Sequence, residues 1–156
     1  MIIEIEHKYL VNAERWKQVT PFKIVPIRQA YLSKDPEKTI RIRVAGDKGF
    51  ITIKGKSVGA SRPEYEYEIP LAEAEELIKN FCNNLIEKTR HYVLYENKTW
   101  EVDIFDGLNS GLIVAEIELN AEDEEYSKPD WIDRDVTRDK KYANSNLTVN
   151  PFTSWE

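Results

Sequence analysis

The chain has 156 residues, which is enough for one domain with a hydrophobic core and too few for two comfortable ones. Charged residues make up 32% and the formal net charge is −6, so a general binder of nucleic acid or of an anionic membrane is disfavoured. The single cysteine, Cys82, excludes an internal disulfide bond and a cysteine-based zinc site. No apolar run has the length of a membrane span, and the acidic start differs from a signal peptide. We therefore expect a cytoplasmic protein with a single domain over 1–156.

The first predicted strand, around 3–10, has charges on one face. Because side chains alternate along a strand, Glu4, Glu6 and Lys8 point the same way. The opposite face has apolar and aromatic character, with Ile3, Ile5, His7 and Tyr9. An ordinary surface strand alternates in the same manner, so the pattern gains meaning only if other strands repeat it.

A short helix and a hairpin are expected next. Asn12 is a good N-cap for the amphipathic segment that follows it. Strands over 24–33 and 38–45 are separated by a polar turn, which is typical of a β-hairpin. In the second of these strands Arg41 and Arg43 share one face, so the charged face recurs with the opposite sign.

Strands expected over 50–56 and 62–69 extend the pattern. On the first, Lys54 lies opposite the isoleucines, and the second has three acids on one face, Glu64, Glu66 and Glu68. Pro70 ends that strand, and helical spacing of apolar residues then predicts a helix over 71–83.

Three more strands, expected over 85–95, 99–105 and 112–119, complete a set of eight. The first of them has two cations on one face, Lys88 and Arg90. The other two have acids, Glu101, Asp103, Glu116 and Glu118. A last helix is expected over 139–147, with two adjacent lysines near its start, Lys140 and Lys141.

Eight strands in antiparallel succession are enough to close a small barrel, which would give the charged faces a common interior. The charges separate by strand into blocks of one sign, whereas a solvated face usually mixes both signs. Like charges inside a barrel are costly unless acids and bases neutralise one another or a charged ligand does so. We therefore expect a β-rich α+β fold: an eight-stranded antiparallel barrel around a tunnel, with flanking helices. An open sheet with its charges in water is the alternative.

The two kinds of charged face suit two kinds of ligand. A wall of arginine and lysine suits phosphate, because the guanidinium fork matches the phosphate oxygens. A carboxylate wall suits a hard cation such as Mg²⁺ or Mn²⁺, which bridges carboxylates to phosphates. Together they predict a polyanion held along one wall and its metal ion along the other.

In their order along the chain, these motifs resemble the CYTH superfamily, the triphosphate tunnel metalloenzymes. Glu4-x-Glu6-x-Lys8 resembles the ExExK signature of that family. The resemblance covers essentially the whole chain through Arg41-x-Arg43, Lys54, Glu64-x-Glu66, Glu87-Lys88-Thr89-Arg90, Glu101-Val102-Asp103, Glu116-x-Glu118, Val136-Thr137 and Lys140-Lys141-Tyr142-x-Asn144. It implies an eight-stranded antiparallel barrel that encloses a tunnel. His7 departs from the arginine that the family often has there, but alternation places it on the outer face.

The resemblance also implies hydrolysis of a triphosphate, with inorganic tripolyphosphate as the expected substrate and Mg²⁺ or Mn²⁺ as the cofactor. It assigns triphosphate binding to Arg41, Arg43, Lys54, Lys88, Arg90 and Lys140, although the adjacent Lys141 competes with Lys140 for that role. It assigns metal binding to Glu4, Glu6, Glu64, Glu66, Asp103, Glu116 and Glu118. We expect Lys8 and Tyr31 to be catalytic: Lys8, with a pKa lowered by neighbouring cations, would help Tyr31 to position or deprotonate the attacking water.

Other functions remain open at this stage. They are a class IV-type adenylyl cyclase, a thiamine or nucleoside triphosphatase, and a non-enzymatic polyphosphate or nucleotide sensor. The sequence has no evident adenine pocket, which favours the smaller substrate, and a sensor would need fewer metal ligands. We expect no nucleic-acid or membrane partner. Because the predicted helices are too few to cover eight apolar outer faces, we expect a homodimer.

Overall fold

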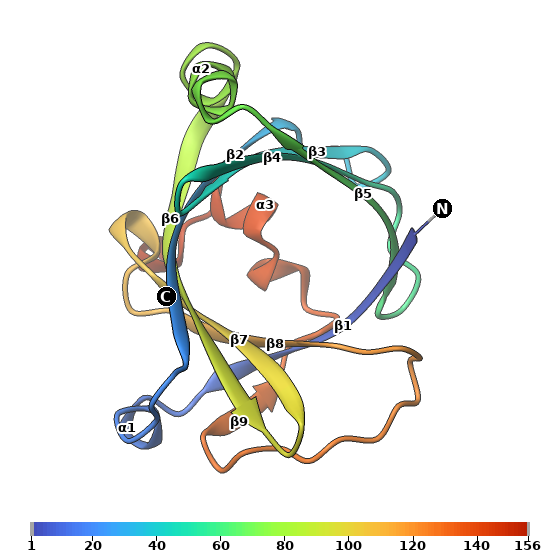
Figure 1. Ribbon diagram of the computed structural model, residues 1–156, viewed down its shortest axis with the longest axis vertical. Coiled ribbons are helices and arrows are strands. Elements are labelled where there is room, and N and C mark those ends of the chain that lie inside the picture. Colours follow the sequence, from blue (N-terminus) through green and yellow to red (C-terminus); the bar gives the residue numbers. More distant parts are fainter. Residues whose placement is uncertain (1, 156) are drawn as a thin grey trace.

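The computed structural model describes residues 2–155 and shows a closed β-barrel (Figure 1). Eight strands form it: β1 (Ile2–Val11), β2 (Lys23–Ser33), β3 (Thr39–Ala45), β4 (Lys48–Lys54), β5 (Ser61–Ile69), β6 (Asn83–Tyr95), β7 (Lys98–Phe105) and β8 (Ile113–Glu118). Their spatial order is β5-β4-β3-β2-β6-β7-β8-β1, every pair is antiparallel, and pairing of β1 with β5 closes the ring. The predicted eight-stranded antiparallel barrel is confirmed.

A ninth strand, β9 (Ile132–Asp135), was not expected from the sequence. It pairs with the end of β1, beyond the part of β1 that pairs with β5. Its four residues show no clear alternation, since two acids and an arginine follow Ile132. The strand exists because the backbone of β1 offers it a partner, and this long-range contact leaves no trace in the local sequence.

Short helices accompany the strands of the barrel. They are α1 (Ala13–Trp16), α2 (Leu71–Phe81) and α3 (Asn144–Leu147), with 3₁₀ turns η1 (Gly107–Asn109), η2 (Lys140–Tyr142) and η3 (Phe152–Ser154). The expected cap is present, since the Asn12 side chain accepts a hydrogen bond from the backbone N–H of Arg15 at 3.0 Å. Within residues 2–155, no helix is long and apolar enough to cross a membrane.

The expected continuous helix over 139–147 is wrong. The structure divides it into η2 and α3, because Ala143 has extended backbone with ψ of 134°. The side chain of Asp139 accepts a hydrogen bond from the N–H of Lys141, which stabilises a tight local turn in place of a regular helix.

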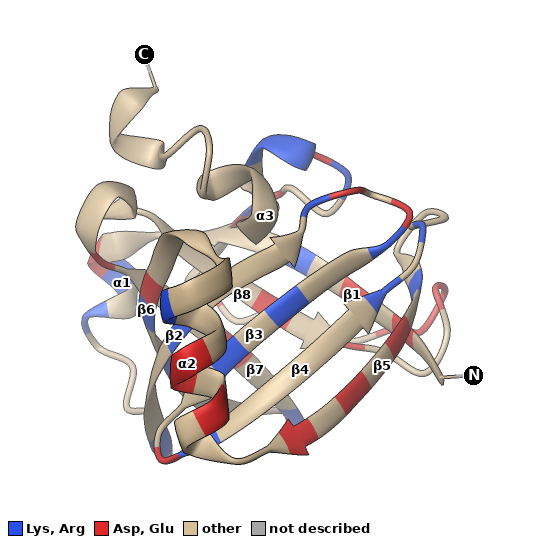
Figure 2. Cartoon of the chain, turned by 90° about the horizontal axis from the view of Figure 1, so that it is seen from above, with Lys and Arg blue, Asp and Glu red and all other residues tan. Residues whose placement is uncertain are grey.

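The apolar residues of the barrel divide into an outer and an inner group. On the outside, α2 covers Ile42 and Val44 of β3, and Trp100 and Trp131 lie in a second cluster. At one end of the barrel the inward-facing positions become apolar and pack against Leu147 of α3 and Tyr142. Viewed along the barrel, α3 lies within the ring of strands, and the side view places it at one end (Figures 1 and 2). The charged part of the interior therefore begins below this apolar end.

Candidate active site

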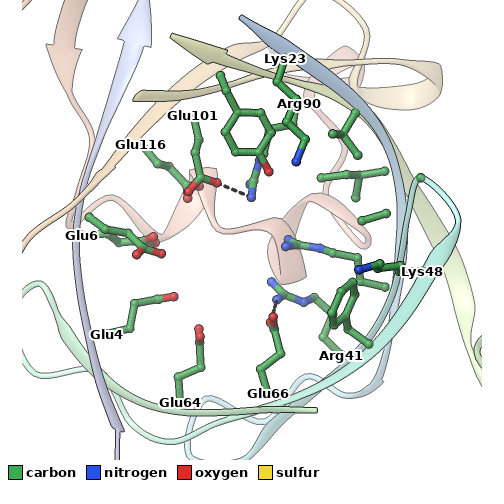
Figure 3. A pocket seen from close by; sticks show the side chains of 18 of the residues that line it. Glu4, Glu6, Lys23, Arg41, Lys48, Glu64, Glu66, Arg90, Glu101 and Glu116 are labelled. Carbon is green, nitrogen blue, oxygen red and sulfur yellow. Dashed lines mark hydrogen bonds and ion pairs between the residues drawn. The ribbon is translucent and has the colours of Figure 1, made fainter. Parts of the chain in front are cut away.

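The charged faces of the strands point into the barrel, as alternation predicts. Lys and Arg positions recur along β3 and acidic positions along β5 (Figure 2). A cavity of about 520 Å³ occupies the interior (Figure 3). Among the residues predicted for the site, its walls contain Glu4, Glu6, Arg41, Arg43, Lys54, Glu64, Glu66, Arg90, Glu116 and Glu118. A smaller chamber of about 90 Å³ adds Lys8, Tyr31 and Lys88.

The acids of the cavity come from neighbouring strands and repel one another. Glu6 lies opposite Glu118 in the pairing of β1 with β8. Burial, together with the charges of Glu116 and Glu4, raises the pKa of Glu6 well above its ordinary value. Burial and the proximity of Glu64 likewise raise the pKa of Glu4 to about 7. The negative charge of this wall is therefore incompletely neutralised by the protein.

Lys54 is the main cation within the acidic wall. Its Nζ lies 3.1 Å from Glu4 and 3.2 Å from Glu64. The β4–β5 register, in which Lys54 lies opposite Glu64, accounts for the second contact. Lys54 thus reduces the repulsion between two acids that enter from different strands.

The basic wall comes from β3 and β6. Arg41 donates to Thr52 at 3.1 Å and pairs with Glu66 at 3.4 Å. Arg90 binds Asp103 in a two-pronged manner at 2.8 and 2.9 Å and also pairs with Glu101. These contacts hold both guanidinium groups in one orientation, which suits recognition of phosphate oxygens.

Asp103, which was predicted to bind metal, has a different environment from the other acids. Its side chain is 1% exposed and is not among those that form the cavity walls. Lys88 lies 2.7 Å away, in addition to Arg90. Although burial acts in the opposite direction, these two cations hold the pKa of Asp103 well below its ordinary range. The geometry therefore favours Asp103 as an anchor for Arg90 and Lys88.

Lys8 has carboxylates around it, and the expected lowering of its pKa is wrong. Its Nζ lies 3.7 Å from Glu116. Burial alone would lower the pKa, but Glu116 and Glu6 outweigh that effect and raise it. Against the effect of burial, Lys8 and Arg90 in turn lower the pKa of Glu116 to about 2. The carboxylates around Lys8 thus favour its charged form.

The two adjacent lysines of η2 point to different places. Lys140 contributes to a cavity of about 380 Å³ at the α3 end, together with Glu4, Glu6 and Lys8. Lys141 instead places its Nζ 4.3 Å from the centre of the Trp155 ring. Of the two, the geometry favours Lys140 for contact with a bound anion.

The residues of the site that were not assigned from the sequence include Glu101, Arg62 and Gln29, as well as Lys23 and Lys48 in the wall of the large cavity. Glu101 and Arg62 both contribute to cavity walls, and alternation along their strands places them on the inward faces with residues that were assigned. Gln29 is completely buried and contacts both Arg43 and Tyr31. Alternation from Tyr31 would have placed Gln29 on the same face, but an uncharged side chain did not fit the pattern of charges.

The carboxylates of the cavity suit a hard divalent cation whose other ligands come from a bound phosphate group. In the part of the chain that the structure describes, no three acidic, histidine or cysteine side chains converge into a complete metal site. Mg²⁺ commonly takes one or two protein carboxylates and completes its coordination with water and substrate phosphates. The acidic wall supplies such carboxylates, since Glu4, Glu6 and Glu64 line the same cavity as the arginines that suit phosphate.

Comparison with known proteins agrees with this geometry. The CYTH domain model matches residues 2–149. An inorganic triphosphatase of Acetivibrio thermocellus is 48% identical over 154 residues, which cover 98% of this chain and 97% of the relative. An inorganic triphosphatase of Nitrosomonas europaea is 34% identical, with coverage of 94% and 97%. The crystal structure of the inorganic triphosphatase NE1496 superposes with a TM-score of 0.65 at 31% identity and covers 96% of each chain. The chain therefore belongs to the CYTH domain family.

Proposed function

We propose that this protein is a metal-dependent inorganic triphosphatase, which hydrolyses tripolyphosphate to diphosphate and phosphate. The observation that carries the proposal is the separation of charge across one cavity: Arg41 and Arg90 lie across from Glu4, Glu6 and Glu64 (Figure 3). Two relatives at 48% and 34% identity are inorganic triphosphatases, which supports the same substrate.

The proposed roles follow from the contacts of each residue. Arg41, Arg43, Lys54, Lys88, Arg90 and Lys140 bind the triphosphate oxygens. The carboxylates of Glu4, Glu6, Glu64, Glu66, Glu116 and Glu118 hold Mg²⁺ or Mn²⁺, while we assign Asp103 to orienting Arg90 and Lys88. The cation would supply charge neutralisation for the phosphate oxygens and activation of water. Lys8 stabilises negative charge that develops during the reaction, since its own charge is secured by Glu116 and Glu6.

The test is a substrate panel with purified protein. We expect phosphate release from tripolyphosphate with Mg²⁺ or Mn²⁺ and none with EDTA. ATP followed by chromatography separates hydrolysis from cyclic AMP formation, and thiamine triphosphate tests the third substrate class. Tight binding of tripolyphosphate without any turnover would instead indicate a sensor.

Lys140 and Lys141 provide a matched pair of substitutions. We expect Lys140→Met to raise the KM for tripolyphosphate by about threefold to tenfold, because a cation is lost at the cavity. Lys141→Met should leave KM unchanged and lower the melting temperature by about 1–4 °C, since its contacts with the rings of Trp155 and Tyr142 are lost. Steady-state kinetics and thermal melts measure both effects. The reverse pattern would show that Lys141 faces the anion.

We also propose a homodimer in the cytoplasm. The outer face of β4 and β5 leaves Ile53, Tyr65 and Tyr67 exposed by 38%, 37% and 57%, and Ile3 of β1 lies beside them. A second copy of the chain would cover this apolar patch. Size-exclusion chromatography with light scattering should give twice the chain mass of 18.3 kDa, and a monomer would remove the proposal. The lone Cys82, without a disulfide partner, suits a reducing compartment.

A further inference from the structure

Gln29 is a buried glutamine that connects two residues of the cavity. It lies in β2 and its side chain is completely shielded from solvent. Its Oε1 accepts a hydrogen bond from Arg43 Nε at 2.9 Å, and its Nε2 donates to the Tyr31 hydroxyl at 3.1 Å. Gln29 lies opposite Arg43 in the β2–β3 pairing, so the strand register itself produces the first contact.

The chemistry of these partners determines the direction of both hydrogen bonds. A guanidinium has only donors, so the amide oxygen of Gln29 must face Arg43. The amide NH₂ then faces Tyr31, whose oxygen must accept. The Tyr31 hydroxyl therefore does not donate its proton to Gln29. Within residues 2–155 this hydroxyl has no other hydrogen-bond partner. Tyr31 is part of the wall of the smaller chamber of about 90 Å³, so its hydroxyl proton is available to a ligand there.

Arg43 differs from the other arginines of the basic wall in its charge balance. Arg41 pairs with Glu66, and Arg90 pairs with Asp103 and Glu101. No carboxylate within ion-pair distance of Arg43 occurs in the described part of the chain, where its side-chain acceptor is the neutral Gln29. Burial and the proximity of Arg41 and Arg90 lower the pKa of Arg43 to about 9. Gln29 thus fixes the orientation of the Arg43 guanidinium group but does not neutralise its charge.

We propose that Gln29 is a positioning residue for the triphosphate: it orients Arg43 and Tyr31 so that both donate to phosphate oxygens, and it leaves the charge of Arg43 for the substrate. The inference rests on the proposed function and deepens it. It also changes the role of Tyr31 from a group that positions or deprotonates water to a hydrogen-bond donor to phosphate. A glutamate at position 29 would hold Arg43 equally well but would neutralise it.

The substitution Gln29→Glu separates positioning from mere packing. The carboxylate has only acceptors, so it would pair with Arg43 and turn the Tyr31 proton away from the chamber. We expect the KM for tripolyphosphate to rise about tenfold or more, while the melting temperature stays equal to or above that of the wild type. The matched control is Gln18→Glu, which makes the same change at the exposed glutamine after α1 and should leave KM unchanged.

A double-mutant cycle tests the direction of the Tyr31 hydroxyl. Tyr31→Phe in the wild type should lower kcat/KM about tenfold, because one donor to phosphate is lost. In the Gln29→Glu background it should have no further effect, since the hydroxyl no longer faces the ligand. Gln29→Met has a similar volume and no charge but makes neither hydrogen bond, so it should also lower kcat/KM about tenfold. This second variant keeps the inference testable if Gln29→Glu does not fold.

The results that would overturn the inference are distinct from a failure of the proposed function. Wild-type KM in folded Gln29→Glu, wild-type kcat/KM in Gln29→Met, or equal effects of Tyr31→Phe in both backgrounds would each overturn it. If the activity of the Gln29 variants falls only in proportion to the amount of folded protein, the inference is also overturned. If the wild type itself releases no phosphate from tripolyphosphate with either metal, the proposed function fails instead.

Discussion

Glu6→Gln is expected to abolish most turnover of tripolyphosphate and at the same time to stabilise the metal-free protein. Glu6 is a proposed metal ligand, so we expect kcat/KM to fall by at least about a hundredfold. The wild-type carboxylate is buried near Glu116 and Glu4, and its pKa is raised because the charged form is unfavourable. Removing that charge should raise the melting temperature without metal by about 2–4 °C at pH 8.

The sign of the pH dependence follows from the raised pKa of Glu6. A carboxyl group with a higher pKa in the folded state destabilises the fold above its ordinary pKa of 4.5, where the unfolded chain is already ionised. The advantage of Glu6→Gln should therefore be present at pH 8 and disappear below about pH 4.5. Thermal melts with and without Mg²⁺ at both pH values measure this. A variant that is less stable than the wild type at pH 8 would contradict the interpretation.

Lys8→Met is expected to lose turnover and to retain binding. Lys8 keeps its proton because Glu116 and Glu6 outweigh the effect of burial, and it lies 3.7 Å from Glu116. A fixed cation of this kind contributes most when negative charge develops in the transition state. We expect kcat to fall by at least about a hundredfold, and the Kd of tripolyphosphate, measured by calorimetry on the inactive variant, to change by less than about tenfold.

Two comparisons make the Lys8 result specific. Lys38→Met removes the same charge from an exposed position and should leave kcat unchanged. Lys8→Arg keeps the charge but alters its position, so it should recover part of the lost turnover. Parallel losses of binding and turnover in Lys8→Met would show that Lys8 only anchors the substrate.

Strand alternation was sufficient to predict which side chains enter the barrel. The period of two is a local property of the chain, so Glu4, Glu6, Arg41 and Arg43 were placed on the correct faces without knowledge of their neighbours. The separation of signs by strand then indicated a shared interior. The same local reasoning failed at β9 and over 139–147, where a backbone partner on β1 and a turn at Asp139 determine the conformation.

The sequence by itself therefore determined the strands, their inward faces and the two kinds of charged wall, because each depends on local periodicity and residue chemistry, whereas closure of the barrel depends on the long-range pairing of β1 with β5. Only the tertiary structure decided how these charges are paired. Asp103 faces Arg90 and Lys88, Lys8 faces Glu116, and the uncharged Gln29 joins Arg43 to Tyr31. Such pairings depend on strand order, register and distances across the interior, which no single segment encodes. They decide whether a charged residue is free to meet the substrate or is already held by the protein.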